Sequence, residues 1–297
     1  MGTYDHGRGK RGPYFEGWYL KLQTGEGAAL ALIPACHMDR EGRRSASLQV
    51  LSDDRSWWLA YPGTAFRASR GEFRVRLGES LFTGQGMRLQ VEGEGLSLHG
   101  TVRYGPFTPL KSDIMGPFRF LPGMECAHGV LSMGHPLEGS VTLNGKTLDF
   151  SGGTGYMETD RGRSFPRAYL WTQCVWQEAS LDSLMLSVAT IPMAGVRFTG
   201  CICAVVDRGR EYRLATYRGA RVERWSGSGA AIRQGKYRLT AELMEGRRCP
   251  LRAPAEGVMG RMVHESLRST VRYRFWEGET LLLDHTDRCA GFEYAEI

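Results

Sequence analysis

Apolar and polar residues alternate along most of the chain, in short runs separated by glycine-containing turns. A period of two places successive side chains on opposite faces of an extended backbone, so each run predicts a β-strand with one buried face. Asn144-Gly145 is the residue pair that two-residue hairpin turns favour. The pattern therefore predicts an all-β, antiparallel protein. The candidate strands are Trp18–Gln23, Ala28–Pro34, Ser45–Leu51, Glu72–Leu77, Met87–Val91, Leu96–Tyr104, Val141–Leu143, Thr147–Phe150, Ala168–Trp176, Leu184–Ile191, Gly200–Val206, Tyr212–Tyr217, Arg221–Ser226, Lys236–Met244, Ser269–Trp276 and Thr280–Asp284.

Two segments do not follow this alternation of apolar and polar residues. Glu256–Leu267 is the one stretch that fits a helix, although Gly257 and Gly260 lower its helix propensity. Gly105–Gly129 holds four prolines among three phenylalanines. A connection this long and aromatic predicts either a strap between two domains or a lid over a pocket.

A pattern of aromatic residues and carboxylates occurs twice, once in Tyr14–Lys21 and again in Gly155–Gln173. Its two glutamates, Glu16 and Glu158, lie about half the chain apart. Each half has enough strands for a small antiparallel barrel, which hides its sheet edges and can hold one apolar ligand. We therefore predict two packed lipocalin-like β-barrels, with residues 1–130 forming the N-terminal barrel and its strap and residues 131–297 the C-terminal barrel. One large β-sandwich is the alternative.

Composition narrows the classes of partner and compartment. The net charge is +6, but the arginines alternate along strands such as Val271–Phe275, which indicates a solvated face rather than a nucleic-acid site. No apolar run approaches the roughly 20 residues that span a bilayer. No apolar segment follows the basic stretch Met1–Gly12, so a cytoplasmic protein is predicted.

The seven cysteines are odd in number and irregularly spaced, which argues against a disulfide framework. Cys201 and Cys203 would share a strand face, but no second pair or nearby histidine completes a metal site. The sequence also lacks a phosphate-binding glycine loop and a nucleophile elbow. We expect buried thiols and no metal.

The first aromatic motif offers one acid. Glu16 and Trp18 would point the same way from an extended strand. Glu16 could then transfer a proton or orient a substrate hydroxyl. Alternatively, Trp18 closes the bottom of a barrel while Glu16 binds backbone amides or an arginine.

The second motif is richer in acids. Glu158 and Asp160 would share a face, where mutual repulsion and burial raise one pKa and Arg161 lowers it again. An ion-pair network closing a barrel is the alternative interpretation. Tyr169, Trp171 and Gln173 then alternate on the face of the next strand.

Glu125 and His128 lie at the end of the proline-rich segment and could form an acid–base pair. A histidine without a clear partner set is more often a structural donor, so the structural interpretation is favoured.

With these residues the chain resembles the tocopherol cyclase family along nearly its whole length, and at fold level it is similar to carotenoid hydratases and lipocalin-like Diels-Alderases. Plant members of the family close a chromanol ring by adding a phenol oxygen to a protonated alkene, without a redox cofactor. The matching stretches are Gly12–Tyr19, Ile114–Phe118, Met124–Gly129, Gly155–Gly162, Ser164–Pro166 and Trp171–Gln173.

The resemblance implies a cofactor-free cyclase, an intramolecular lyase of the isomerase class. It assigns Glu158 or Asp160 as the acid, and Glu16 or Gln173 as the group that orients the phenol. The residues expected to bind substrate are Trp18, Tyr19, His128, Tyr156, Arg161, Tyr169, Trp171 and Gln173.

This chain departs from plant-type members at Arg161 and Tyr169, where they have tryptophan. The departure widens the expected substrate from tocopherol precursors to another prenylated phenol or quinol, a terpenoid or a polyketide. A lipocalin-like carrier that binds such a ligand unchanged, and a structural protein braced by the two motifs, are the alternatives. Contact with a membrane stays open, because a lipophilic substrate has to be collected from somewhere.

Overall fold

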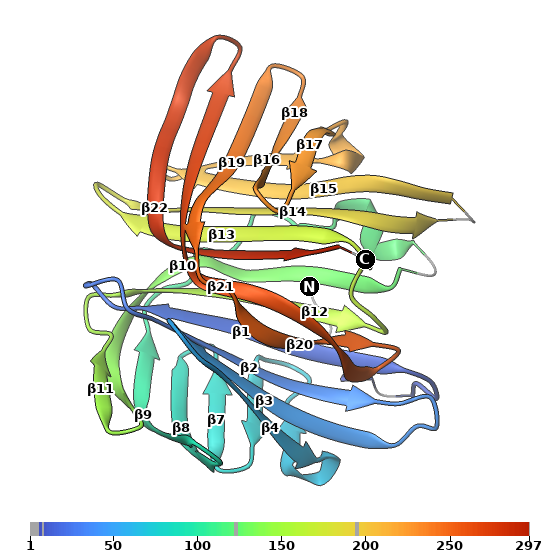
Figure 1. The fold of residues 1–297 in the computed structure, drawn as a ribbon, viewed down its shortest axis with the longest axis vertical. Coiled ribbons are helices and arrows are strands. Elements are labelled where there is room, and N and C mark those ends of the chain that lie inside the picture. Colours follow the sequence, from blue (N-terminus) through green and yellow to red (C-terminus); the bar gives the residue numbers. More distant parts are fainter. Residues whose placement is uncertain (1–5, 8, 122–123, 194–195, 297) are drawn as a thin grey trace.

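The computed structural model describes residues 6–7, 9–121, 124–193 and 196–296, and in these ranges it contains strands and short 3-10 turns but no α-helix. All strand pairs are antiparallel and form two large sheets (Figure 1). The prediction of an all-β, antiparallel architecture is confirmed. In the same ranges, no helix is long and apolar enough to span a membrane.

The first sheet has twelve strands in the order β4-β3-β2-β1-β12-β10-β9-β8-β7-β6-β5, with β11 paired to β10. It occupies the lower half of Figure 1, in blue to green. Its strands are β1 (Tyr14–Gln23), β2 (Ala29–Met38), β3 (Arg44–Ser52), β4 (Ser56–Pro62), β5 (Phe66–Ala68), β6 (Arg74–Leu77), β7 (Ser80–Thr83), β8 (Gly86–Gly93), β9 (Leu96–Tyr104), β10 (Cys126–Leu143), β11 (Lys146–Asp149) and β12 (Thr154–Gly162), and the 3-10 turn η1 (Gly63–Ala65) precedes β5.

The second sheet has ten strands in the order β16-β15-β14-β13-β22-β21-β19-β18-β17, with β20 paired to β21. Most of it lies in the upper half of Figure 1, in yellow to red, and β20 with the adjoining part of β21 extends down beside the first sheet. Its strands are β13 (Tyr169–Gln177), β14 (Leu181–Met193), β15 (Val196–Asp207), β16 (Arg210–Ala215), β17 (Arg221–Ser226), β18 (Gly229–Gln234), β19 (Tyr237–Gly246), β20 (Cys249–Ala255), β21 (Val258–Glu277) and β22 (Thr280–Ala295), and η3 (Thr216–Arg218) follows β16.

The helix predicted over Glu256–Leu267 is wrong. The segment begins in the turn of the β20–β21 hairpin and continues as strand β21. Glu256 and Gly257 both have positive φ, at 49° and 78°. A side chain on Gly257 would meet the carbonyl oxygen of Met38, so this glycine serves a tight turn packed against β2 rather than a helix.

Three apolar clusters fill the part of the protein that the structure describes. One is enclosed by the first sheet and contains Trp18 and Leu20, and another is enclosed by the second sheet and contains Leu170 and Phe292. The third lies between the sheets and contains Tyr19 among its members. Successive residues of β1 therefore serve different cores, as the strand period requires.

The predicted division at residue 130 falls inside β10, and the first sheet continues to Gly162. The second aromatic motif does not open a second barrel as a unit. Its first part is β12, which pairs with the first motif in β1 and sets Tyr19 opposite Glu158. Its later part, from Tyr169, begins the second sheet. The two motifs are thus neighbours in one sheet, which periodicity along the chain does not reveal.

The proline-rich segment connects β9 to β10 within the first sheet and crosses to contact the second sheet. Near its start, Thr108 exchanges backbone hydrogen bonds with β10. Farther along, the Arg213 guanidinium of β16 donates to the carbonyl oxygens of Ser112 and Asp113, at 3.1 Å each. Ile114 is buried beyond them, and the 3-10 turn η2 (Gly116–Phe120) follows. The segment is therefore a strap, and residues 122 and 123 of it lie outside the described ranges.

Candidate active site between the sheets

A cavity of about 160 Å³ lies between the two sheets. Both sheets and the strap contribute to its walls, which are largely aromatic and aliphatic. Met115 and Phe118 of the strap line it, so the segment is a wall of the pocket as well as a connection. Apolar surroundings of this kind suit an apolar ligand and strengthen any electrostatic interaction made inside them.

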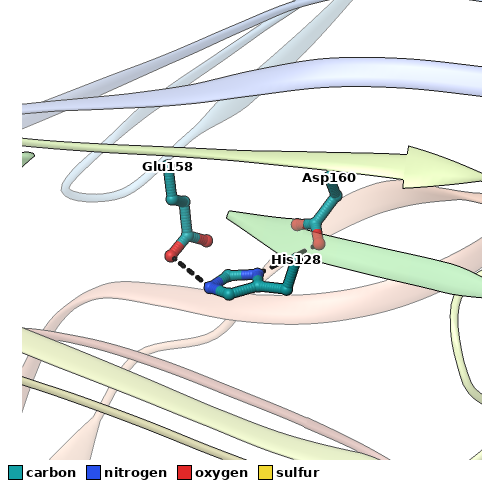
Figure 2. A group of neighbouring side chains, drawn as sticks. All are labelled: His128, Glu158 and Asp160. Carbon is teal, nitrogen blue, oxygen red and sulfur yellow. Dashed lines mark hydrogen bonds and ion pairs between the residues drawn. The ribbon is translucent and has the colours of Figure 1, made fainter. Parts of the chain in front are cut away.

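One wall carries His128 between two carboxylates (Figure 2). His128 lies on β10, whose antiparallel register with β12 places it opposite Asp160 and places Val130 opposite Glu158. The imidazole Nδ1 is 3.0 Å from Oδ1 of Asp160, and Nε2 is 3.4 Å from Oε2 of Glu158. Both carboxylates face the cavity because they are two positions apart on one strand, with Thr159 between them.

Glu158 is buried and accepts hydrogen bonds from Tyr156 Oη at 2.6 Å and Trp171 Nε1 at 3.1 Å. Burial raises the pKa of Glu158 to about 7, although His128 opposes the shift. Burial disfavours the charged form of His128, but Glu158 and Asp160 outweigh it and raise its pKa to about 9. The group therefore holds a cationic imidazole beside a carboxyl group that exchanges its proton near neutral pH.

A second pair of acids, Glu265 on β21 and Glu293 on β22, lines the same cavity. The two are directly opposite in the antiparallel register. Tyr19 Oη donates to Glu265 Oε1 at 2.5 Å, and Tyr169 Oη donates to Glu293 Oε1. Burial raises the pKa of Glu265 to about 7, and burial with the adjacent Glu265 carboxyl raises that of Glu293 to about 8.

Sequence reasoning missed this second pair. Glu265 fell within the predicted helix, and Glu293 lies beyond the last predicted strand. A signal was present in Cys289–Tyr294, where Glu293 is the one charged residue of an otherwise apolar and aromatic run. Its pairing with Glu265 depends on register and is not visible in the sequence.

Two hydrogen bonds of the site cross between the sheets in opposite directions. Tyr19 of the first sheet donates to Glu265 of the second, and Trp171 of the second donates to Glu158 of the first. Each sheet thus supplies a donor to an acid of the other.

Half of the predicted substrate-binding residues line the cavity. Tyr156 is buried behind the wall and touches the site through its bond to Glu158. The predicted site residues that line the cavity are Tyr19, His128, Glu158, Asp160, Tyr169 and Trp171.

Besides Tyr156, four predicted residues do not line it. Glu16 and Trp18 do share a face of β1, as predicted, but Trp18 packs into the core of the first sheet. Glu16 accepts hydrogen bonds from Tyr14 Oη at 3.2 Å and pairs with His6 Nδ1 at 2.9 Å. Arg161 lies opposite Glu16 in the β1–β12 register, and His128 is the cation that lowers the pKa of Glu158. Gln173 is buried away from the cavity wall.

The donor atoms of His128, Glu158 and Asp160 lie within 4.8 Å of one another, so the three could hold a metal ion. Both imidazole nitrogens already face carboxylate oxygens, and Glu158 also accepts from Tyr156 and Trp171. A metal would have to replace a ring nitrogen's contact with a carboxylate. The observed arrangement fits a proton-sharing network without that rearrangement.

No protein-family model matches the chain, and no curated protein matches it in sequence. The chain does match solved structures. An AttH-like protein of Nitrosomonas europaea is 16% identical at a TM-score of 0.54, with 94% of this chain and 90% of that one covered. Kievitone hydratase of Nectria haematococca is 9% identical at a TM-score of 0.55, with 100% and 93% covered. CghA with Sch210972 is 11% identical at 0.58, with 96% and 89% covered. The chain shares their lipocalin-like β fold.

The buried acids predict how stability depends on pH. Glu158, Glu265 and Glu293 each have a folded-state pKa raised above the ordinary value of 4.5, and His128 is raised above 6.5. The folded state therefore binds more protons than the unfolded state, so the free energy of unfolding should fall as pH rises from about 5 to 9. Urea denaturation at pH 5.5, 7.0 and 8.5 measures this. Glu293→Gln should flatten the upper part of the trend, and stability that increases over this range would contradict the assignment.

Proposed function

We propose that this protein is a cofactor-free enzyme that begins its reaction by protonating a carbon–carbon double bond of a hydrophobic substrate. The observation that carries the proposal is the His128–Glu158–Asp160 network set in an apolar, aromatic cavity. An acid with a pKa near 7 is suited to proton transfer at neutral pH. The fold shared with a kievitone hydratase and with CghA supports a cyclase or hydratase chemistry.

Within this class, we favour ring closure on a prenylated phenol or quinol, as the resemblance to tocopherol cyclases implies. Glu158 gives its proton to the alkene, and the phenol oxygen bonds to the cationic carbon. Asp160 takes the phenolic proton, and a proton passes back through His128 to Glu158, so the acid is restored and the product is an isomer of the substrate. Trp171 and Tyr19 line the same cavity, and their aromatic rings stabilise the positive charge. His128 and Asp160 hold Glu158 in place and set its charge.

The phenol needs a partner that Glu16 and Gln173 cannot supply from their positions outside the cavity. Asp160 is exposed to the cavity on the same wall as the acid and is the acceptor that we assign to the phenol. This assignment keeps proton donor and acceptor two residues apart on β12, with His128 between them.

The test is to incubate the purified protein with prenylated hydroquinones of different tail length in D₂O and to analyse the products by chromatography and mass spectrometry. Ring closure gives an isomer that carries one non-exchangeable deuterium at the former alkene carbon. Hydration instead gives a product heavier by one water. Substrates that bind but are recovered unchanged and undeuterated would overturn the enzyme proposal in favour of a carrier.

A further inference from the structure

Glu265 and Glu293 have bonding capacity that the protein does not use. Their side chains are 1% and 7% exposed, and one oxygen of each accepts a tyrosine hydroxyl. The second oxygen of each has no hydrogen-bond partner among the described residues, and neither carboxyl group has a lysine or arginine within ion-pair distance there. Both residues line the cavity, so each offers it a carboxylate oxygen without a protein partner, and two such acceptors on one wall point to a ligand group.

One buried cation acts on the pair without bonding to it: the charge of Lys21 lowers the pKa of Glu265, but burial has the larger effect and raises it. Lys21, on β1, donates to the carbonyl oxygen of Cys289 behind the wall rather than to either acid. Across the cavity, His128 is occupied by Glu158 and Asp160. The acids of the cavity therefore outnumber the cations available to them.

The remaining ionisable groups of the wall do not change this balance. Glu125 pairs with Arg163 at 3.0 Å, and the guanidinium of Arg252 lies over the Trp58 ring. Burial lowers the pKa of His37 to about 4, so it is neutral at pH 7.

Aromatic rings stand beside the pair. Tyr19 and Trp171 pack edge-to-face with ring centroids 5.2 Å apart, and Tyr169 lies on the same wall. Ring faces attract cations, and more strongly where water is excluded. Carboxylates and rings together favour an organic cation over a metal ion, which needs more oxygen ligands than these two carboxyl groups offer.

We propose that Glu265 and Glu293, with Tyr19, Tyr169 and Trp171, form a second subsite that takes the positively charged group of an apolar ligand, such as a protonated alkylamine. The cavity then discriminates among lipids by head group: ammonium is preferred to hydroxyl, and carboxylate is rejected. This binding preference goes beyond the proposed reaction and does not require turnover.

The experiment is calorimetric titration of the full-length protein at pH 7 with geranylamine, geraniol and geranic acid, which share one tail and differ at the head group, in buffer containing EDTA. Geranylamine should bind about tenfold more tightly than geraniol. Its ammonium group donates a hydrogen bond to a glutamate carboxylate, so both partners are charged, whereas the hydroxyl group of geraniol is neutral. Geranic acid should bind most weakly. Equal affinity of the amine and the acid would overturn the proposal.

Proton exchange gives an independent readout. Burial raises the pKa values of Glu265 and Glu293 to about 7 and 8, so the pair is partly protonated at pH 7. The amine should displace a proton, and its binding heat should differ between buffers of different ionisation enthalpy. Its affinity should increase from pH 6 to 8.5, whereas that of geraniol should change little. Glu158, Asp160 and His128 face the pair from the other sheet, so the same titrations are run with Glu158→Gln.

The double variant Glu265→Gln, Glu293→Gln should lose the preference for the amine while retaining geraniol binding. Glu277→Gln is the matched control, because Glu277 is also on β21 but pairs with Lys236 outside the cavity. An unchanged preference in the double variant would overturn the proposal. Failure of the proposed function is distinguishable from this result, because a protein without turnover would still show the head-group order in binding.

Discussion

Glu158→Gln should reduce the rate of substrate conversion by about 10²–10⁴-fold, the usual contribution of a general acid, while ligand affinity changes far less. The amide keeps the volume of the side chain, and its oxygen can still accept from Tyr156 and Trp171. It cannot deliver the proton. Single-turnover kinetics and calorimetric titration of the same preparation separate the two effects.

The matched control is Glu125→Gln. Glu125 lines the same cavity but pairs with Arg163, so its loss should leave conversion within a few-fold of the parent. A second readout comes from His128, whose pKa should fall from about 9 when the carboxylate of Glu158 is removed, and NMR titration of the imidazole detects this. Full activity in Glu158→Gln would remove Glu158 as the acid.

Trp18→Ala should lower the free energy of unfolding by about 3–5 kcal/mol, the cost of emptying a large aromatic site in a packed core. Trp18 is 0% exposed and stacks on Phe66 with ring centroids 6.2 Å apart and an interplanar angle of 15°. Urea denaturation followed by circular dichroism gives the change, provided that the variant is studied at a temperature where it remains folded.

Trp58→Ala is the comparison for this second prediction. Trp58 lies half-buried on the edge strand β4, so its removal should cost much less than that of Trp18. The folded fraction of Trp18→Ala should keep its affinity for ligand, because Trp18 belongs to the core of the first sheet rather than to the cavity wall. A variant with normal stability and lost ligand binding would show that Trp18 is part of the binding site.

The strand alternation predicted the fold class well because it reflects burial directly. In β1 it also grouped Glu16 with Trp18 correctly, but it could not say which core that face serves. The structure buries both faces of the strand: Trp18 points into the first sheet, while Tyr19 points to the cavity. A pattern based on polarity distinguishes buried from exposed, and it cannot distinguish one buried compartment from another.

Some of the candidate acids could be predicted from the sequence, and others could not. Glu158 and Asp160 could be found because they lie two residues apart in a dense motif. Their link to His128 was not predictable, since it depends on β10 lying beside β12. Glu265 and Glu293 come together only through the register of the last two strands, and an incorrect helix assignment was enough to hide one of them.

The two hydrogen bonds that cross between the sheets, from Tyr19 to Glu265 and from Trp171 to Glu158, make the chemistry a property of the assembled chain. Either sheet alone would hold an acid that lacks the donor from the other sheet, and with one wall of the cavity missing that acid would face water and return toward its ordinary pKa. Under the proposed mechanism, a nascent or partly unfolded chain would therefore be inactive, and the cationic intermediate would form only after the two sheets have enclosed the apolar cavity.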